Sequence, residues 1–329
     1  MTNNKSNSLT LSKFVAVTSI IEFSSSLFYL SGSWTYGTSS STSLQSTQFV
    51  PSTASCITFD SEENVITISC RSANLTDIYN QLKDLNVLYK DEGGNADGIW
   101  LLDAGITVTE NAILYINSSD TSWLKIIADG NIAHPISISG SLVIDSVKMT
   151  SWNPTTNNYT LSQDSHRDGE DTTIGTPRPY IVVEPEATGT TNITNSEIAY
   201  LGYESGYGGG RTGLRYEGAD GSIIRGSNIH NLYFAFYSKG VGGMIIENNH
   251  IHDNIHYGLD PHTGTHDMII RNNTVHDNGS IGIICSLDCY NVIIESNNVY
   301  NNTKMGIMFS KNMYDSIARN NTVSNEDEE

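Results

Sequence analysis

Basic residues are scarce in this chain of 329 residues. It contains 17 Lys and Arg against 36 Asp and Glu, which gives a formal net charge of −19. Non-specific nucleic-acid binding needs a basic surface, so the composition argues against it. An anionic ligand would also need a local track of cations within an unfavourable overall field. The positions of the few lysines and arginines therefore matter for any such partner.

Cysteines are few as well, with four in the chain. Cys56 and Cys70 flank a hairpin-like run, Ile57–Ser69, and can form a disulfide if the protein is exported. Cys285 and Cys289 are four residues apart in a predicted strand, which would separate their Cα atoms by about 13 Å, too far for a disulfide. We expect Cys285 to be a core thiol. No Cys/His pair accompanies them at ligand spacing, so the sequence predicts no zinc site.

Long apolar runs are lacking too. Phe14–Ile21 is apolar, but Glu22 interrupts it before Leu27–Leu30, and the stretch is too short and broken for a membrane span. We interpret residues 1–55 as a secretory signal or short anchor followed by a Ser/Thr-rich linker; a disordered tail is the alternative. The prediction is an extracellular or cell-surface protein.

A repeat of 22 to 24 residues fills the C-terminal part of the chain. Each unit begins at an isoleucine of one aligned set: Ile223, Ile245, Ile269, Ile293 and Ile317. Short β-branched runs separated by Asn, Gly and Asp turns predict a parallel β-helix rather than a leucine-rich horseshoe. We therefore expect an all-β protein, a right-handed parallel β-helix over 98–329 with regular repeats at 223–325.

Helical periodicity is confined to Asn74–Leu88, where Asn74 can cap the start. A solenoid exposes an apolar cross-section at its end, so we assign this helix and the preceding hairpin to an N-terminal cap at 56–97. A partner-binding helix is the alternative. Ser151–Pro177 is polar and aperiodic and predicts a long loop. Tyr203–Arg211 is a Gly/Tyr-rich insertion that either edges a carbohydrate cleft or forms an ordinary turn.

Equivalent residues of successive coils should stack about 4.8 Å apart. One column is an asparagine ladder whose amides can hydrogen-bond along the stack: Ser227, Asn249, Asn273, Asn297 and Asn321. A second column alternates in charge, which predicts ion pairs rather than substrate contacts: Arg225, Glu247, Arg271, Glu295 and Arg319. A third column carries rings: His230, His252, His276 and Tyr300.

We interpret the third column as a structural stack of histidines. A metal site is the alternative, but the nearest carboxylates, Asp253 and Asp277, are adjacent in sequence and should point elsewhere.

The segment His256–Asp267 is crowded with groups that can move protons: Tyr257, Asp260, His262, His266 and Asp267. Strand alternation places Leu259 and Pro261 inside and turns Asp260 and His262 outward. The outward columns also contain Arg215, Tyr237 and Lys239 from preceding coils and Ile284, Ser286 and Met308 from later ones. Pro261 cannot donate a ladder hydrogen bond, so this coil departs from the sheet pattern at the polar cluster, and such departures often mark functional sites.

The six residues Tyr-Gly-Leu-Asp-Pro-His at 257–262, within Asn-rich β-helix repeats, resemble the mannuronan (alginate) C5-epimerases. The similarity covers about 213–325. It implies that the protein removes the proton at C5 of a uronate in an anionic polysaccharide and returns a proton from the other face. It also implies that His262 and Tyr257 are the acid/base pair, that Asp260 assists them, and that Lys304 is the family's basic residue.

The chain departs from the family's pattern at two places. Leu287 follows Ser286 where periplasmic members have an arginine, so neutralising the substrate carboxylate would fall to the lysines Lys304, Lys239 or Lys311. Thr263 replaces a usual acidic residue. Arg215, Tyr237 and His266 complete the candidate substrate-binding residues. No catalytic metal or other cofactor is expected, although some family members bind a structural calcium ion.

Two other functions remain open. A polysaccharide lyase would use the same residues but expel the C4 oxygen by β-elimination, and a non-catalytic surface β-helix would only bind carbohydrate. Hydrolase chemistry needs two carboxyl groups roughly 5–9.5 Å apart, and Asp260 lacks an obvious carboxylate partner in the adjacent coils.

Overall fold

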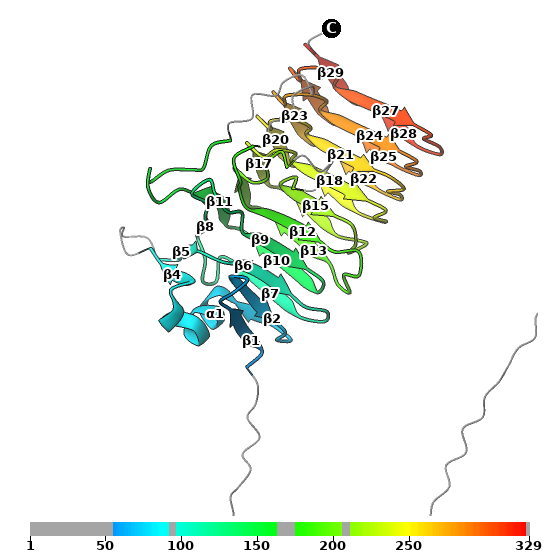
Figure 1. Cartoon of the computed structure of the whole chain (residues 1–329). Helices are drawn as coiled ribbons and strands as arrows, with labels where there is room; N and C mark the ends of the chain where they lie inside the picture. The colour runs from blue at the N-terminus through cyan, green and yellow to red at the C-terminus, as the bar shows by residue number, and fades with distance from the viewer. Residues whose placement is uncertain (1–54, 92–96, 163–174, 206–210, 327–329) are drawn as a thin grey trace, which may run out of the picture. The chain divides into compact units, whose positions relative to one another are not determined.

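The computed structural model describes residues 55–91, 97–162, 175–205 and 211–326. The predicted signal and linker, except Ser55, lie outside the described residues, as do parts of the two long loops, 163–174 and 206–210. The described chain winds in successive coils, and its strands stack into three sheets, which we call A, B and C (Figure 1). Each regular coil adds one strand to each sheet. No helix in these residues is long and apolar enough to cross a membrane.

Sheet A contains ten strands, which run in the following order: β1 (Ile57–Asp60), β2 (Val65–Ile68), β6 (Gly105–Val108), β9 (Pro135–Ile138), β12 (Tyr180–Val183), β15 (Leu214–Tyr216), β18 (Phe236–Lys239), β21 (Leu259–His262), β24 (Ile283–Leu287) and β27 (Ile307–Lys311). Only the β1–β2 pair is antiparallel in this sheet.

Sheet B contains nine strands: β3 (Ala73–Asn74), β7 (Ile113–Asn117), β10 (Ser141–Asp145), β13 (Thr191–Thr194), β16 (Ile223–Arg225), β19 (Ile245–Glu247), β22 (Ile269–Arg271), β25 (Ile293–Glu295) and β28 (Ile317–Arg319). Sheet C contains ten strands: β4 (Leu88–Lys90), β5 (Ile99–Leu102), β8 (Trp123–Ile127), β11 (Lys148–Trp152), β14 (Glu197–Ala199), β17 (Asn228–His230), β20 (His250–His252), β23 (Thr274–His276), β26 (Asn298–Tyr300) and β29 (Thr322–Ser324).

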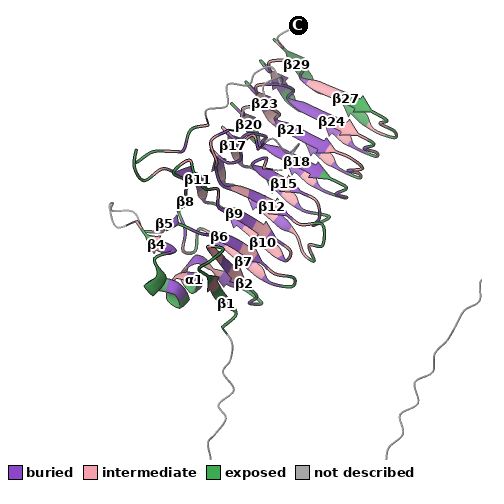
Figure 2. Cartoon of the chain, viewed as in Figure 1, coloured by how far each residue is buried: buried purple, intermediate pink, exposed green. Residues whose placement is uncertain are grey.

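The register of sheet B confirms the predicted repeat. Ile223, Ile245, Ile269, Ile293 and Ile317 are direct neighbours in successive strands. The residue after each of the first four is buried: Ile224, Ile246, Ile270 and Ile294. Figure 2 shows buried positions along the sheets. The charge column is confirmed by ion pairs of Glu247 with Arg225 and Arg271, and of Glu295 with Arg319.

Residues with a positive φ turn the chain at each corner. Between sheets B and C these are Gly226, Asn248, Asn272, Ser296 and Asn320. Between sheets C and A they are Asn231, Asp253, Asp277, Asn301 and Asn325. Asn, Asp and Gly tolerate the left-handed region better than other residues. The richness in Asn and Asp therefore follows from the geometry of the corners.

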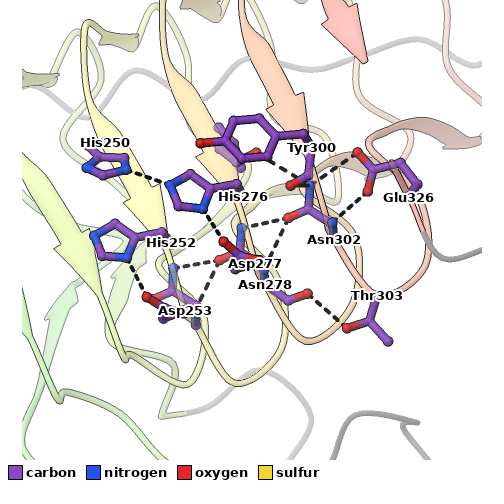
Figure 3. Close-up of polar contacts among 12 residues, drawn as sticks. His250, His252, Asp253, His276, Asp277, Asn278, Tyr300, Asn302, Thr303 and Glu326 are labelled. Atoms are coloured by element: carbon purple, nitrogen blue, oxygen red, sulfur yellow. Dashed lines mark hydrogen bonds and ion pairs between the residues drawn. The ribbon is translucent and has the colours of Figure 1, made fainter. Parts of the chain in front are cut away.

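The asparagine ladder forms as predicted. The amide nitrogens of Asn249, Asn273 and Asn297 each donate to the side-chain oxygen of the next member at 3.0 Å. A second ladder at the C–A corner was not predicted. It runs from Asn254 through Asn278 to Asn302 at 2.8 Å per step and ends on Glu326 (Figure 3). Both ladders satisfy buried polar groups that would otherwise oppose folding.

The N-terminal hairpin and its Cys56–Cys70 disulfide are present. Helix α1 (Leu75–Leu82) starts at a capping box formed by Asn74 and Asp77, and it buries Leu75, Ile78 and Leu82 over the first coil. The prediction that the helix reaches Leu88 is wrong. A 3-10 turn, η1 (Lys83–Leu85), follows α1, and the left-handed Asn86 then redirects the chain into β4.

Two further local predictions are wrong. Cys289 does not lie in the strand of Cys285, because β24 ends at Leu287 and Asp288 has a positive φ. The bend brings the two thiols into hydrogen-bond contact in the core, where both are free and buried. Ser151 and Trp152, placed at the start of the long loop, belong to β11.

Candidate functional site

The candidate site lies on the outer face of sheet A, at β21. In the pairing of β18 with β21, Tyr237 lies beside Asp260 and Lys239 beside His262. Toward β24 the ladder has a single residue pair, Leu259 with Ile283. The hydrogen-bonded pairing of β21 with β24 is therefore interrupted directly after Leu259. The unpaired part includes Pro261, which has no N–H to donate. The predicted departure from the sheet pattern therefore coincides with the polar cluster.

Asp260 is 2% exposed, so the outward position predicted for it is buried rather than open to solvent. Its side chain accepts a hydrogen bond of 2.6 Å from the Ser286 hydroxyl across the interrupted ladder. Burial raises the pKa of Asp260 to about 8, against the opposing effect of the Ser286 hydrogen bond. At neutral pH this carboxyl group is therefore mostly protonated.

Two other members of the outward columns are also buried, Tyr237 at 8% and Ile284 at 5% exposure. Tyr237 belongs to a cluster outside the main core with Tyr233 and Phe234, against which Ile255 and Tyr257 pack. Tyr237 lies in β18, and the other four side chains come from the turns that precede β18 and β21. They remove water from one side of the site, which strand alternation alone does not predict.

Tyr257 lies in the turn before β21, edge-on to Phe234 at 4.9 Å between ring centroids. Burial, then the nearby Asp260, raises the pKa of Tyr257, while a hydrogen bond with Ser280 lowers it. Gly258 must follow, because a Cβ there would lie 2.4 Å from the carbonyl oxygen of Gly282 in the next coil. The Tyr-Gly pair thus lets two backbones approach closely beside the phenol.

His262 ends β21 and is half-buried. Its Nδ1 is bonded to the Thr263 hydroxyl, and the Tyr237 ring lies 5.4 Å away. Burial, then Lys239, lowers the pKa of His262. The imidazole is therefore neutral at pH 7, and Nε2 is the nitrogen that remains for a ligand, since no other described side chain is bonded to it.

The predicted cations are distributed around the cluster. Lys239 is exposed in the preceding coil, beside His262. Lys304 lies one coil beyond Ser280, whose carbonyl accepts its backbone N–H at 3.1 Å. Lys311 is exposed at the end of β27, in register with Leu287. Arg215 forms an ion pair with Glu217 and lies 5.0 Å above the Tyr237 ring.

The structure brings Tyr257, Asp260, His262, Tyr237 and Lys239 into one cluster. His266 lies apart from it, at the corner after β21, where its Nδ1 bonds Asp267 and its ring stacks on Tyr290 at 4.8 Å. Lys304 and Lys311 flank the cluster without a described contact to it.

Sequence reasoning missed the supporting roles of two serines, Ser280 beside Tyr257 and Ser286 beside Asp260. The role of Ser286 could have been found from the sequence, because the repeat alignment places this serine outward one coil after His262. The sequence contains no such signal for Ser280, since its role depends on the path of a turn. No three His, Cys, Asp or Glu side chains within the described ranges are arranged to hold a metal ion.

Comparisons with known proteins identify the fold. Residues 181–328 match the family model described as a right handed beta helix region. A search of curated proteins found no match. The crystal structure of the periplasmic alginate epimerase AlgG aligns with a TM-score of 0.64 and 22% identity over 77% of this chain, which spans 58% of the AlgG chain. A double mutant of AlgG aligns with a TM-score of 0.61 and 22% identity, over 79% of this chain and 63% of that one.

The A-module of the mannuronan C-5 epimerase AlgE6 from Azotobacter vinelandii aligns more loosely, with a TM-score of 0.43 and 15% identity over 70% of this chain and 67% of that one. At these identities the likeness concerns the fold. The chain is a right-handed parallel β-helix with an N-terminal helical cap, of the same architecture as AlgG.

Proposed function

We propose that the protein epimerises uronate residues of an anionic polysaccharide at C5, in the manner of mannuronate to guluronate conversion. The observation that carries the proposal is the cluster on β21, in which a neutral imidazole, a phenol and a protonated carboxyl group lie together beside an interrupted ladder. The Tyr-Gly-Leu-Asp-Pro-His motif at 257–262 and the fold shared with AlgG agree with it.

The proton at C5 of a uronate is weakly acidic, so its removal needs a base, an acid on the opposite face and a group that neutralises the carboxylate. His262 and Tyr257 serve as the acid/base pair: one takes the C5 proton and the other returns a proton from the far side. The lowered pKa of His262 keeps Nε2 able to accept a proton. Asp260, protonated through burial, adds no negative charge beside Tyr257 at neutral pH.

The substrate carboxylate needs a cation, because the chain has a net charge of −19. Lys239, adjacent to His262, and Lys304 and Lys311 in later coils supply it. Arg215 acts less directly, since its guanidinium is paired with Glu217 and covers the Tyr237 ring. The reaction needs no cofactor; a structural calcium ion is compatible with it.

We place the protein in an extracellular or cell-surface compartment. The Cys56–Cys70 disulfide supports this, because such bonds persist in oxidising environments.

The test is incubation with polymannuronate in D₂O, followed by proton NMR for loss of the C5 signal and appearance of guluronate. We expect the wild type to exchange C5 with solvent and His262→Ala to lose about 10²–10⁴-fold in rate, the usual contribution of acid–base groups. His252→Gln is the matched control, since this imidazole lies on sheet C.

Two outcomes would overturn the proposal. Release of unsaturated sugars, detected by ultraviolet absorbance, would identify the alternative β-elimination by a lyase. Exchange by His262→Ala at the wild-type rate, or no exchange by either protein, would leave carbohydrate binding without catalysis.

A further inference from the structure

Three imidazoles meet on the outer face of sheet C, on a different sheet from the β21 cluster. His252 pairs in register with His276, and alternation places Ile251 and Val275 in the core. It also brings His250, two residues before His252, onto the same outer face. The ring centroids lie 4.2 Å apart for His250–His252, 4.9 Å for His250–His276 and 5.2 Å for His252–His276.

The stack predicted from the sequence is confirmed, since His252 lies parallel to both His230 and His276, and His276 to Tyr300. The expectation that the neighbouring carboxylates point elsewhere is wrong. Each corner residue folds back onto the histidine before it.

Asp253 bonds Nδ1 of His252 at 2.6 Å, and Asp277 bonds Nδ1 of His276 at 2.5 Å (Figure 3). A carboxylate on Nδ1 fixes the orientation of an imidazole and raises the basicity of Nε2, as it does for histidines that bind metals. For His252 this Nε2 is already bonded to Asn228 at 2.9 Å.

The Nε2 atoms of His250 and His276 face each other at 2.6 Å (Figure 3). One proton can lie between them, and a metal ion can replace it. Nitrogen ligands lie about 2.0–2.1 Å from such an ion, so two of them at a right angle are about 2.9 Å apart, against about 3.3 Å in a tetrahedron. The observed 2.6 Å is shorter than both, so the two rings must move apart by about 0.3 Å to bind one ion at a right angle, and by more to bind it in a tetrahedron. The smaller movement favours the right angle, which Cu²⁺ and Ni²⁺ prefer.

The surroundings favour a cation over a second proton. Asp253 and Asp277 lie beside the rings, and the chain is strongly acidic. His250 is exposed, so solvent can complete the coordination. Two nitrogens are the whole protein contribution, in agreement with the lack of a described three-residue metal group.

We propose that Nε2 of His250 and Nε2 of His276 form a surface site for a tetragonal divalent transition-metal ion, Cu²⁺ above all. The two ligands come from adjacent strands, β20 and β23, so the ion clamps successive coils of the helix. The shared proton leaves to solvent as the ion binds.

The probe is Cu²⁺ added to protein freed of metal with a chelator. Isothermal titration measures the affinity, and electron paramagnetic resonance detects two imidazole nitrogens on the ion. We expect His250→Gln and His276→Gln each to weaken binding at least about tenfold and to abolish the two-nitrogen signal. Asp277→Asn should weaken it about 10–100-fold, as for other carboxylates behind metal ligands.

His230→Gln is the matched control, since His230 stands in the same stack but its Nε2 faces Glu197 at 3.4 Å. It should bind Cu²⁺ as the wild type does. Cu²⁺ should also raise the melting temperature of the wild type and not that of His250→Gln, because a ligand that binds only the folded state stabilises it. Unchanged affinity in His250→Gln, or a wild type with one coordinated nitrogen, would overturn the proposal.

Discussion

At the scale of single residues, Asp260 has the most altered chemistry in the candidate site. It stands on the outer face of a strand, where a carboxylate would ordinarily be hydrated, yet it is 2% exposed, with Tyr237 of β18 beside it. Desolvation opposes ionisation and raises its pKa to about 8. The same burial that makes it a protonated acid at neutral pH also makes its ionisation costly for the fold.

Replacing Asp260 with asparagine should therefore change how stability depends on pH. Between pH 4 and 8 folded Asp260 keeps a proton that the unfolded chain has released, so the wild type loses stability as pH rises through this window. The Asp260→Asn side chain cannot ionise. Its free energy of unfolding should therefore rise relative to that of the wild type by up to about 1.4 kcal/mol per pH unit in this window. Urea unfolding at pH 5 and pH 8 measures the difference.

Asp267→Asn is the control for that experiment. Hydrogen bonds with His266 and Asn291 lower the pKa of Asp267, so its ionisation affects stability only in more acidic solution. Its unfolding free energy should follow the wild type between pH 5 and 8. Parallel curves for Asp260→Asn and wild type would show that Asp260 is already ionised in the folded protein.

Lys304→Ala addresses the cation that the proposed reaction requires. The change leaves Tyr257 and His262 in place but removes a positive charge one coil beyond Ser280. Hydrogen bonds to charged groups contribute about 1.5–3 kcal/mol, so kcat/KM for C5 exchange should fall roughly tenfold or more. The loss should shrink at high salt, which screens exposed charges. Lys148→Ala, whose lysine pairs with Glu197 on sheet C, should exchange as the wild type does; an equal loss there would point to general attraction of the polyanion.

At the scale of elements, the asparagine ladder holds the corner between sheets B and C. Asn273 accepts from the backbone and side-chain nitrogens of Asn249 and donates to the carbonyl of Ile246, all near 3.0 Å. Asn273→Ala would leave these buried groups unsatisfied, at about 1–3 kcal/mol each. We expect a loss of about 3 kcal/mol in unfolding free energy, measured by urea denaturation.

Asn321→Ala tests the same contact at a half-buried position in the last described coil. Water can replace the amide there, so the loss should be clearly smaller than for Asn273→Ala. Equal losses at both positions would mean that burial does not determine the contribution of the ladder.

The repeats also mark the limit of what the sequence predicts at this scale. The columns that contain Ile223 and Asn249 can be predicted from the repeat period, because stacked coils place equivalent residues above one another. The burial of Asp260, the contact of Cys289 with Cys285 and the end of α1 at Leu82 depend on where single turns redirect the chain. The repeat period does not fix the path of those turns, and tertiary packing decides it.

At the scale of the whole molecule, a solenoid is close to one-dimensional. Each coil contacts its neighbours and little else, so stability is approximately a sum of coil and interface terms. The described chain follows this pattern, since every internal strand from β6 to β26 pairs only with the strands of the coils before and after it. Damage at one end should therefore stay near that end.

The Cys56–Cys70 disulfide allows this property to be tested. It closes a loop with a sequence separation of 14 residues, and a loop of this length contributes about 3 kcal/mol. Replacing both cysteines with serine should release β1 and β2, the first strands of sheet A. Hydrogen exchange should then become faster around 57–68 and remain slow in β20 to β24, with C5 exchange intact. A uniform loss of protection along all coils would mean instead that the β-helix unfolds as one cooperative unit, so that the cap stabilises the distant site as much as the first coil.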